Sequence, residues 1–356
     1  MESLTKRLAP DPGSSTLVIV DEQTQIGGAR RSAVEIGHTQ GLSPDAVGRL
    51  AIIVTEAATN IIRHAGRGLM VFRALQHESG ATVEVLALDK GPGIADVRRA
   101  MRDGFSTTGT PGHGLGSMQR LADLFALYSQ PDTGTALVAR VGERMTLPGR
   151  SPLVPSLEDR VGAICVPLRG ENECGDAWRI LATRRGVSVL LVDGLGHGPD
   201  AAATAAMATA VFPRVAAEPP DQALLAMNEA MRGSRGAAVS VAMIDLAARQ
   251  AHFSGVGNVD GRVITLETTE HLMPQNGIVG HTMPTVRPTT IPWPADARLV
   301  MHSDGITTRW RQDAYPGLMT AHPALVAGVI YRDFARERDD ATVLVIGDHP
   351  ALARIT

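Results

Sequence analysis

A proline-rich break near the middle of the sequence most constrains how this chain can fold. The segment ERMTLPGRSPLVPSLED, residues 143–159, holds three prolines and one glycine and separates two blocks of patterned apolar sequence. Prolines at this density interrupt both helices and sheet ladders, so the segment is typical of a linker. We therefore expect two domains, over residues 1–142 and 158–350, joined by a linker over residues 143–157.

Composition excludes several classes of function. The 34 basic and 37 acidic side chains give a net charge of −3, which offers no electrostatic basis for binding nucleic acid. The first residues lack an apolar signal core, and no apolar run approaches the roughly 20 residues of a membrane span. We expect a soluble, cytoplasmic protein without nucleic-acid or membrane partners. Its two cysteines, Cys165 and Cys174, are too few for a disulfide scaffold and indicate reduced core thiols.

Lysine is nearly absent, and this limits how the chain could hold a nucleotide. Lys6 and Lys90 are the two lysines of the sequence, and neither lies in a G-x-x-x-x-G-K-[ST] string. A P-loop is therefore excluded, and neither lysine follows the strand pattern of an ordinary protein-kinase site. A nucleotide site in this chain must grip phosphate without the usual lysine.

The first block predicts an α+β sandwich with helices on one face of a mixed sheet. A long helix begins at Ser43-Pro44-Asp45, which combine a capping side chain, a proline at the first helical position and an acid near the positive helix end. The other helices are expected over residues 28–36 and 115–126, and the strands over residues 15–20, 69–75, 82–88 and 135–141.

The second block is richer in strands and predicts two antiparallel sheets flanked by helices, an αββα sandwich. Strands are expected over residues 178–183, 187–192, 237–245, 251–256, 262–266, 298–302 and 342–346. Helices are expected over residues 199–212, 221–231 and 323–336.

Three polar residues of the long helix are spaced so that they share one helix face, where they could act as a base or bind a metal ion. Glu56, Asn60 and His64 lie at i, i+4 and i+8, on one face opposite the apolar stripe. Glutamate can act as a general base and an asparagine oxygen can bind Mg²⁺. An ordinary solvated polar face has the same spacing, so the pattern alone leaves both interpretations open.

Two glycine-containing strings follow in the first block. Asp89-Lys90-Gly91-Pro92-Gly93 ends a strand and allows a tight turn with close approach of the backbone to a ligand, although a simple turn looks alike. The run GTPGHGLGS, residues 109–117, leads into a helix and could offer backbone N–H groups to phosphate. Each string alone is weak evidence for a nucleotide site. Their order and spacing along the chain are stronger evidence.

Together these strings resemble the GHKL ATPase superfamily, and within it the short bacterial anti-sigma-factor and stress-switch serine kinases. EAATNIIRHA resembles the N box, DKGPGI the first glycine box and GHGLGS the second, followed by Asp132–Thr135. The resemblance implies ATP with Mg²⁺, with Asn60 on the metal, Asp89 on the adenine amino group and Glu56 as the base. It also implies an adenine-side turn at Gly91 and Gly93, a phosphate lid at Gly112, Gly114 and Gly116, and a water-mediated adenine contact at Thr135.

Four acids in the second block lie at predicted strand ends. If Arg184-Arg185-Gly186 turns a hairpin, then Asp176 and Asp193 lie almost opposite each other. Like charges facing each other destabilise a sheet unless cations lie between them. Asp304 and Asp339 also adjoin strands, and a set of carboxylates without matching histidines or thiols favours Mg²⁺ or Mn²⁺. Turn and capping aspartates remain the alternative for each acid taken alone.

The strings CGDAW, VDGLGHGPDA, MHSDGIT and RDDATVLVI, in this order, resemble the PPM-type serine/threonine phosphatases, in particular the SpoIIE/RsbX branch. The resemblance implies two Mn²⁺ or Mg²⁺ ions and hydrolysis without a covalent enzyme intermediate. Asp193 would bridge the ions, the Gly194 carbonyl would join one of them, and Asp304 and Asp339 would complete the other, with Asp176 beside the pair. Asp340 is the alternative to Asp339. His197 either assists the leaving seryl oxygen or organises its loop.

These resemblances predict a two-domain partner-switch regulator. Its phosphatase would act on phosphoserine or phosphothreonine of a small regulatory protein, such as an anti-sigma antagonist of the STAS kind, and its kinase-like domain would phosphorylate or sequester such a protein. Two alternatives stay open: a first domain that binds nucleotide only as an allosteric sensor or scaffold, and a wholly non-catalytic adaptor. The sequence also leaves oligomerisation open.

Overall fold

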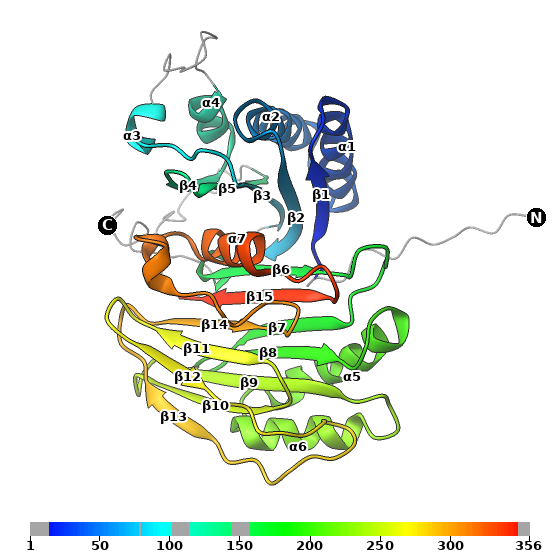
Figure 1. Ribbon diagram of the computed structural model, residues 1–356. Coiled ribbons are helices and arrows are strands. Elements are labelled where there is room, and N and C mark those ends of the chain that lie inside the picture. Colours follow the sequence, from blue (N-terminus) through cyan, green and yellow to red (C-terminus); the bar gives the residue numbers. More distant parts are fainter. Residues whose placement is uncertain (1–13, 78–79, 102–113, 144–156, 348–356) are drawn as a thin grey trace, which may run out of the picture.

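The computed structural model describes residues 14–77, 80–101, 114–143 and 157–347, and these contain three five-stranded sheets (Figure 1). Every pair of neighbouring strands in them is antiparallel. The α+β class is therefore confirmed. Most of the predicted linker, residues 143–157, lies outside the described residues. None of the helices in the described ranges is long and apolar enough to cross a bilayer.

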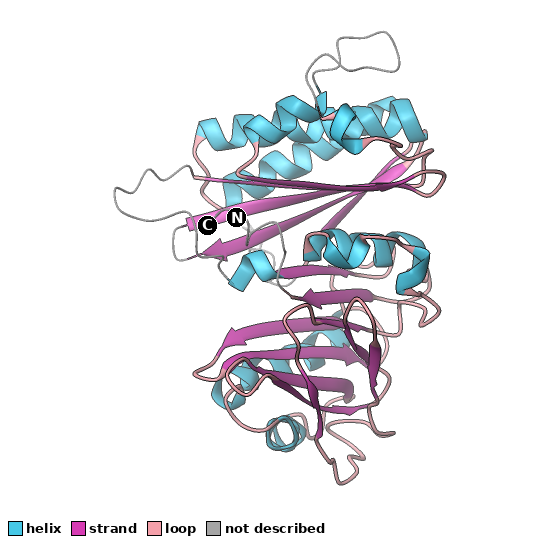
Figure 2. Cartoon of the chain, turned by 90° about the vertical axis from the view of Figure 1, so that its left-hand side faces the viewer, coloured by secondary structure: helices cyan, strands magenta, loops and turns pink. Residues whose placement is uncertain are grey.

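The first sheet carries its helices on one face (Figure 2). Its strand order is β1-β2-β3-β5-β4. The apolar stripe of α2 is buried against the sheet together with α1. The elements are β1 (Thr16–Val20), α1 (Gln23–Thr39), α2 (Pro44–Asn60), the π-helical turn η1 (Ile61–Ala65), β2 (Gly68–His77), β3 (Gly80–Asp89), α3 (Val97–Ala100), α4 (Gly114–Leu121), β4 (Leu124–Gln130) and β5 (Gly134–Gly142).

The second and third sheets pack face to face as a sandwich, as predicted. One has the order β13-β10-β9-β8-β7 and is covered by α5 and α6, and the other has the order β12-β11-β14-β15-β6 and is covered by α7. The elements are η2 (Leu157–Arg160), β6 (Val161–Val166), β7 (Asp176–Ala182), β8 (Gly186–Gly194), α5 (Pro199–Val215), α6 (Pro220–Ala230), β9 (Ala237–Asp245), β10 (Gln250–Val256), β11 (Asp260–Ile264), β12 (Thr269–Leu272), β13 (Thr289–Pro292), β14 (Arg298–His302), η3 (Gln312–Ala314), η4 (Leu318–Thr320), α7 (Pro323–Phe334) and β15 (Ala341–Ile346).

The structure corrects three expectations. The first sheet is antiparallel rather than mixed, because β1 and β2 are joined by a pair of helices that returns the chain in the opposite direction, whereas a single crossover helix would make them parallel. The helix predicted over residues 115–126 ends at Leu121, and β4 follows. Strands β6, β12 and β13 were not expected. Short apolar runs such as VGAICV in β6 carry no period that separates strand from helix.

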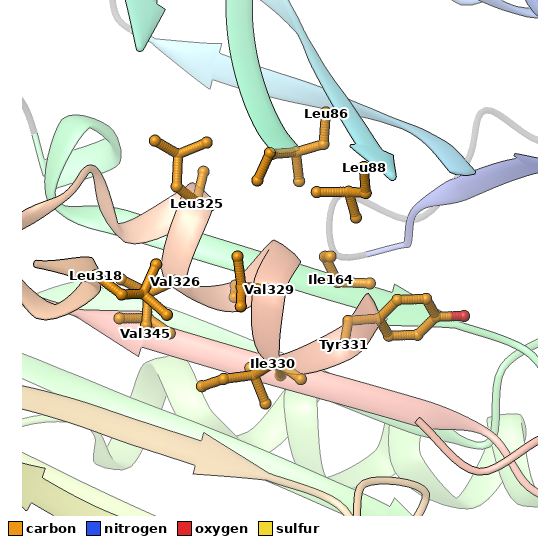
Figure 3. Packing of buried hydrophobic residues seen from close by; sticks show 14 of the residues in the cluster. Leu86, Leu88, Ile164, Leu318, Leu325, Val326, Val329, Ile330, Tyr331 and Val345 are labelled. Atoms are coloured by element: carbon orange, nitrogen blue, oxygen red, sulfur yellow. The ribbon is translucent and has the colours of Figure 1, made fainter. Parts of the chain in front are cut away.

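Helix α7 is buried between the two domains. Residues Pro323 through Arg332 are all buried, although a helix on the surface of a domain normally exposes one face. Leu86 and Leu88 of β3 pack on it from one side, and Ile164 of β6 and Val345 of β15 from the other (Figure 3). The two domains therefore share one continuous apolar core.

Glycine at position 328 lets α7 approach the first sheet closely. A β-carbon added to Gly328 would lie 2.8 Å from Cδ2 of Leu88, which is itself completely buried. The helix thus sits against the leucines of β3 with no room for a larger side chain.

A buried charge network lies in the same sheet. Glu84 Oε1 accepts a hydrogen bond from Arg73 Nη2 at 2.8 Å, and its Oε2 accepts one from Arg140 Nε at 2.7 Å. Arg140 also donates to the carbonyl of Val161, and the Arg73 guanidinium lies 5.6 Å from the ring centre of Trp178. Both arginines therefore link the first sheet to the second domain.

The pKa values of this network follow from its burial. Burial acts to raise the pKa of Glu84, but the charges of Arg73 and Arg140 outweigh it and lower that pKa to about 2. Burial lowers the pKa of Arg73, although a guanidinium still stays charged at any ordinary pH. The carboxylate is thus the member of the network whose titration affects stability.

We expect Glu84→Gln to lower the free energy of unfolding at neutral pH by about 3–5 kcal/mol, because two buried guanidinium groups lose their counter-charge. Since the folded-state pKa lies below the ordinary value, the stabilisation is complete above that value and is lost as the pH falls toward about 2. Urea unfolding should therefore show a smaller difference between the variant and the wild type at about pH 3 than at neutral pH.

Asp313→Asn serves as the control, because Asp313 pairs with Arg311 at the exposed surface. Its effect on the free energy of unfolding should be small, because solvent screens an exposed ion pair. Equal effects of the two substitutions at neutral pH would contradict the structural role of Glu84.

Candidate functional sites

The first candidate site lies where α2 ends. Ser43 accepts a hydrogen bond from the Ala46 N–H and Pro44 is the first helical residue, so the predicted start of this helix is confirmed. Glu56 and Asn60 occupy its last turns and are partly exposed. The regular helix ends at Asn60 and continues as η1, so the i+4 spacing does not extend to His64.

Helix α4 begins beside these two residues. A β-carbon added to Gly114 would lie 3.3 Å from Glu56 Oε2 and 3.7 Å from Asn60 Nδ2. Gly116 is buried within α4. Gly112 of the predicted phosphate lid lies outside the described residues. The structure therefore brings together Glu56, Asn60 and the first glycine of α4.

Asp89 forms the second part of this site, at the end of β3. Its Oδ1 accepts hydrogen bonds from Gly91 N at 2.8 Å and from Thr135 N at 3.3 Å. Within the described part of the chain, Oδ2 accepts none. Burial raises the pKa of Asp89, partly offset by the two backbone hydrogen bonds. A partly buried carboxylate oxygen is thus left to accept a hydrogen bond from a ligand.

Both glycines of the Asp89 turn are required by its shape. A β-carbon on Gly91 would lie 2.8 Å from the β-carbon of Ala65. Gly93 has φ +70°, and a β-carbon there would lie 2.2 Å from the carbonyl oxygen of Gln130. The turn can therefore follow β3 so closely only with glycine at these two positions.

The second candidate site is built on β7 and β8. Asp176 and Asp193 are directly paired across these strands, which confirms the predicted hairpin register. Asp176 is buried and its Oδ2 accepts a hydrogen bond from Ser303 Oγ at 2.6 Å. Burial, together with the charge of Asp193, raises the pKa of Asp176 well above its usual range. The sheet thus carries two carboxylates that repel each other.

Asp304 and Asp339 approach the same pair. The Asp304 N–H lies 3.5 Å from Asp193 Oδ2, and Asn258 Nδ2 donates to Asp304 Oδ2 at 2.6 Å. Burial and then the charge of Asp304, with a further contribution from Asp339, raise the pKa of Asp193 to about 7. Burial and the charge of Asp339 also raise the pKa of Asp304, and the charge of Arg336 partly offsets this rise. These acids interact strongly, and none forms an ion pair with an arginine or lysine of the described residues.

Asp339 and Asp340 have different surroundings. Both oxygens of Asp340 are engaged by backbone, since Oδ1 accepts from Leu168 N at 2.6 Å and Oδ2 from Gly175 N at 2.7 Å. Asp339 is partly exposed and its Oδ1 accepts from Asp340 N. Asp340 therefore fixes the loop before β7, and Asp339 keeps an oxygen available.

The donor set suits hard cations, although it is not a closed cage. Within the described residues, no group of three or more acidic, histidine or cysteine side chains is arranged to hold a metal ion. Carboxylates that repel one another are expected to stand apart, and ions of this type complete their coordination with carbonyls and water. Gly194 stands at the end of β8 beside Asp193, and its N–H donates to Gly175 O at 3.1 Å.

Several contacts could not be assigned from sequence. Asn258 lies in the string GVGNVDG and Ser303 in MHSDGIT, so both were within strings typical of the phosphatases, but their partners Asp304 and Asp176 are far away in the chain. His197 Nδ1 lies 2.9 Å from Glu171 Oε1, a pairing without any local signal.

The two sites are joined by the end of α7. Arg332 Nη1 donates to the Asp89 carbonyl at 2.7 Å, and Lys90 lies 3.3 Å from Asp333. Just beyond the helix, Arg336 N donates at 2.7 Å to the carbonyl of Gly305, the residue after Asp304. A few residues of backbone thus link the Asp89 turn to the acid cluster.

Comparison with known proteins agrees with this division. Residues 19–141 match the family described as histidine kinase-like ATPase domain, and residues 183–347 match stage II sporulation protein E (SpoIIE). The chain is 34% identical over 111 residues to serine/threonine-protein kinase RsbT of Bacillus subtilis (strain 168), covering 31% of this chain and 84% of RsbT. It is 26% identical over 140 residues to phosphoserine phosphatase RsbX of the same organism, covering 38% of this chain and 69% of RsbX.

A solved chain shares its fold with about half of this chain. It comes from work on the bacterial stressosome as a modular system adapted to control secondary messenger signaling, and it aligns with a TM-score of 0.50 and 24% identity over 52% of this chain and 97% of its own length. Both predicted resemblances are therefore confirmed. The chain belongs to the histidine kinase-like ATPase family through an RsbT-like N-terminal domain, which is fused to a C-terminal SpoIIE-type PP2C phosphatase domain.

Proposed function

We propose that the C-terminal domain dephosphorylates phosphoserine or phosphothreonine on a small regulatory protein of the anti-sigma antagonist kind. The observation that carries this proposal is the group of interacting carboxylates at the strand ends, none of which forms an ion pair with an arginine or lysine of the described residues. The similarity to a phosphoserine phosphatase, RsbX, supports the same class of substrate. The retained acids argue against a purely adaptor role.

In this proposal Asp193 and Gly194, with Asp304, Asp339 and Asp176, hold two Mn²⁺ or Mg²⁺ ions. Such ions, when bound, supply an activated water and offset phosphoryl charge. The chain's other residues position these ligands: Asn258 orients Asp304, Ser303 holds Asp176, and Asp340 fixes the loop before β7. Glu171 restrains His197, which supports a loop-organising role for this histidine.

The decisive experiment measures Mn²⁺-dependent phosphate release from a phosphoserine peptide. We expect Asp193→Ala and Asp304→Ala each to reduce the rate by more than about 100-fold, because ligands contribute at least as much as the residues that position them. Asp313→Ala, at an exposed surface ion pair, should leave the rate unchanged. Activity that survives in both ligand variants would overturn the phosphatase assignment.

We propose further that the N-terminal domain binds ATP with Mg²⁺ between α2, α4 and the Asp89 turn. Asn60 would hold the metal, Asp89 Oδ2 would accept from the adenine amino group, and Thr135 would contact the adenine through water. Gly112, Gly114 and Gly116 would supply backbone donors to phosphate. Glu56, close to Gly114, would act as the base that orients a protein hydroxyl for phosphate transfer.

Binding and transfer are tested separately. Asp89→Asn and Asn60→Ala should each weaken ATP binding by about 10-fold or more in calorimetric titration, because each removes a charge-assisted or metal contact. In a phosphatase-dead Asp193→Ala background, Glu56→Gln should abolish transfer of labelled phosphate to a regulatory protein while ATP still binds. Unchanged ATP affinity in the Asp89 and Asn60 variants would contradict this nucleotide site.

A second candidate role for the N-terminal domain is a nucleotide sensor that acts on the phosphatase. The Arg332 hydrogen bond to the Asp89 carbonyl favours it, because this contact joins the proposed adenine turn to the helix beside the acid cluster. A sensor and a kinase are compatible on one nucleotide site.

The sensor role predicts coupling between ATP and Mn²⁺. ATP should shift the Mn²⁺ concentration for half-maximal phosphatase activity by about 5-fold or more, and Arg332→Met should remove the shift while both ligands still bind. Arg311→Met is the matched control, because Arg311 also pairs with a nearby aspartate but lies on the exposed surface. A shift that persists in Arg332→Met would refute this route of coupling.

A further inference from the structure

The two cysteines of the chain lie side by side. Cys165 is near the end of β6 and Cys174 is in the loop before β7, and their sulfur atoms are 3.6 Å apart. Both are free thiols. We propose that Cys165 and Cys174 are a reversible disulfide site, oxidised by hydroperoxides, that controls the acid cluster of the phosphatase domain.

The two cysteines have different backbone settings. Cys165 is paired with Thr342 of β15, and its carbonyl accepts from Ser15 N at 2.8 Å, so sheet contacts hold it on both sides. Cys174 belongs to a segment without regular structure. A disulfide requires a sulfur–sulfur distance of about 2.05 Å, so the Cys174 sulfur must approach by about 1.5 Å.

Small oxidants can reach the pair. A groove of about 1950 Å³ runs between the two domains and is lined by both cysteines, by β1 and by β7. Cys174 is partly exposed in it, whereas Cys165 is buried. Cys174 is therefore the thiol that the oxidant reaches first, and Cys165 is the resolving thiol. The hydrogen bond with Cys165, burial and the charges of Asp176 and Asp340 raise the pKa of Cys174, so its oxidation is expected to be slow.

The chemistry balances with one hydroperoxide. The Cys174 sulfur attacks the outer peroxide oxygen, the O–O bond breaks, and the thiol proton leaves with the second oxygen as an alcohol, or as water from hydrogen peroxide. The Cys165 sulfur then attacks the sulfenic sulfur, the S–S bond forms, the S–O bond breaks, and water leaves with the Cys165 proton. Two electrons pass from the thiols to the peroxide, and a dithiol reductant returns them.

The consequence for the phosphatase follows from the next residues along the chain. Gly175 donates to Asp340 Oδ2 at 2.7 Å, and its carbonyl accepts from Gly194 N at 3.1 Å. A β-carbon on Gly175 would lie 2.7 Å from both Ala201 Cβ and Asp340 Oδ2, so the backbone at Gly175 is tightly packed. We therefore expect a disulfide that draws the Cys174 backbone toward β6 to weaken the Gly175–Asp340 hydrogen bond and to shift Asp176. This effect on metal binding rests on the proposed metal site, whereas disulfide formation does not.

The disulfide is tested on the full chain with hydrogen peroxide. Wild type should lose both free thiols and the mass of two hydrogen atoms without forming dimers, and dithiothreitol should restore both. Cys174→Ser and Cys165→Ala, each checked for folding by circular dichroism, should give no such intramolecular product. Two thiols that stay free in the folded wild type, or dimers in place of the internal product, would overturn the proposal.

Mn²⁺ affinity, measured by titration calorimetry, tests the coupling. Oxidised wild type should bind Mn²⁺ at least about 10-fold more weakly than reduced wild type, the scale on which residues that position ligands act. Peroxide should leave the affinity of Cys174→Ser unchanged. Equal affinity of the two wild-type forms would overturn control of the acid cluster. Failure of reduced wild type to bind Mn²⁺ would instead overturn the proposed metal site, because the thiol count reports the disulfide independently.

Discussion

The burial of α7 between two sheets is the interaction on which the rest of this structure depends. Its leucines and valines meet β3 on one side and β6 and β15 on the other. Each large apolar side chain buried in this way contributes about 1.5–3 kcal/mol relative to exposure. Separating the domains would expose both the helix and the leucines of β3, so the apolar core holds the ATPase-like sheet and the phosphatase sandwich together.

Buried charges also help to hold the two domains together, and they give the phosphatase domain its acidic site. The Glu84 carboxylate is satisfied by Arg73 and Arg140, whose guanidinium groups reach across to the second domain. In the phosphatase domain the opposite situation holds, since Asp176 and Asp193 face each other without a basic partner among the described residues. A buried charge that is paired supports the fold, and a group of unpaired like charges is the environment that a bound cation would stabilise.

Sequence predicted those parts of the molecule that depend on local rules. The opposition of Asp176 and Asp193 follows from a hairpin turn, and the start of α2 follows from Ser43 and Pro44, so both could be foreseen. The strand that begins at Leu124 was mistaken for helix, because its apolar run has no distinctive period. The Arg332–Asp89 and Asn258–Asp304 contacts arise only from tertiary packing.

The central claim is that the two domains form one cooperative unit around α7, and differential scanning calorimetry tests it most directly. The shared core predicts one unfolding transition that shifts as a whole when a non-hydrolysable ATP analogue with Mg²⁺ is added. Two separate transitions, of which the nucleotide shifts only one, would contradict the claim.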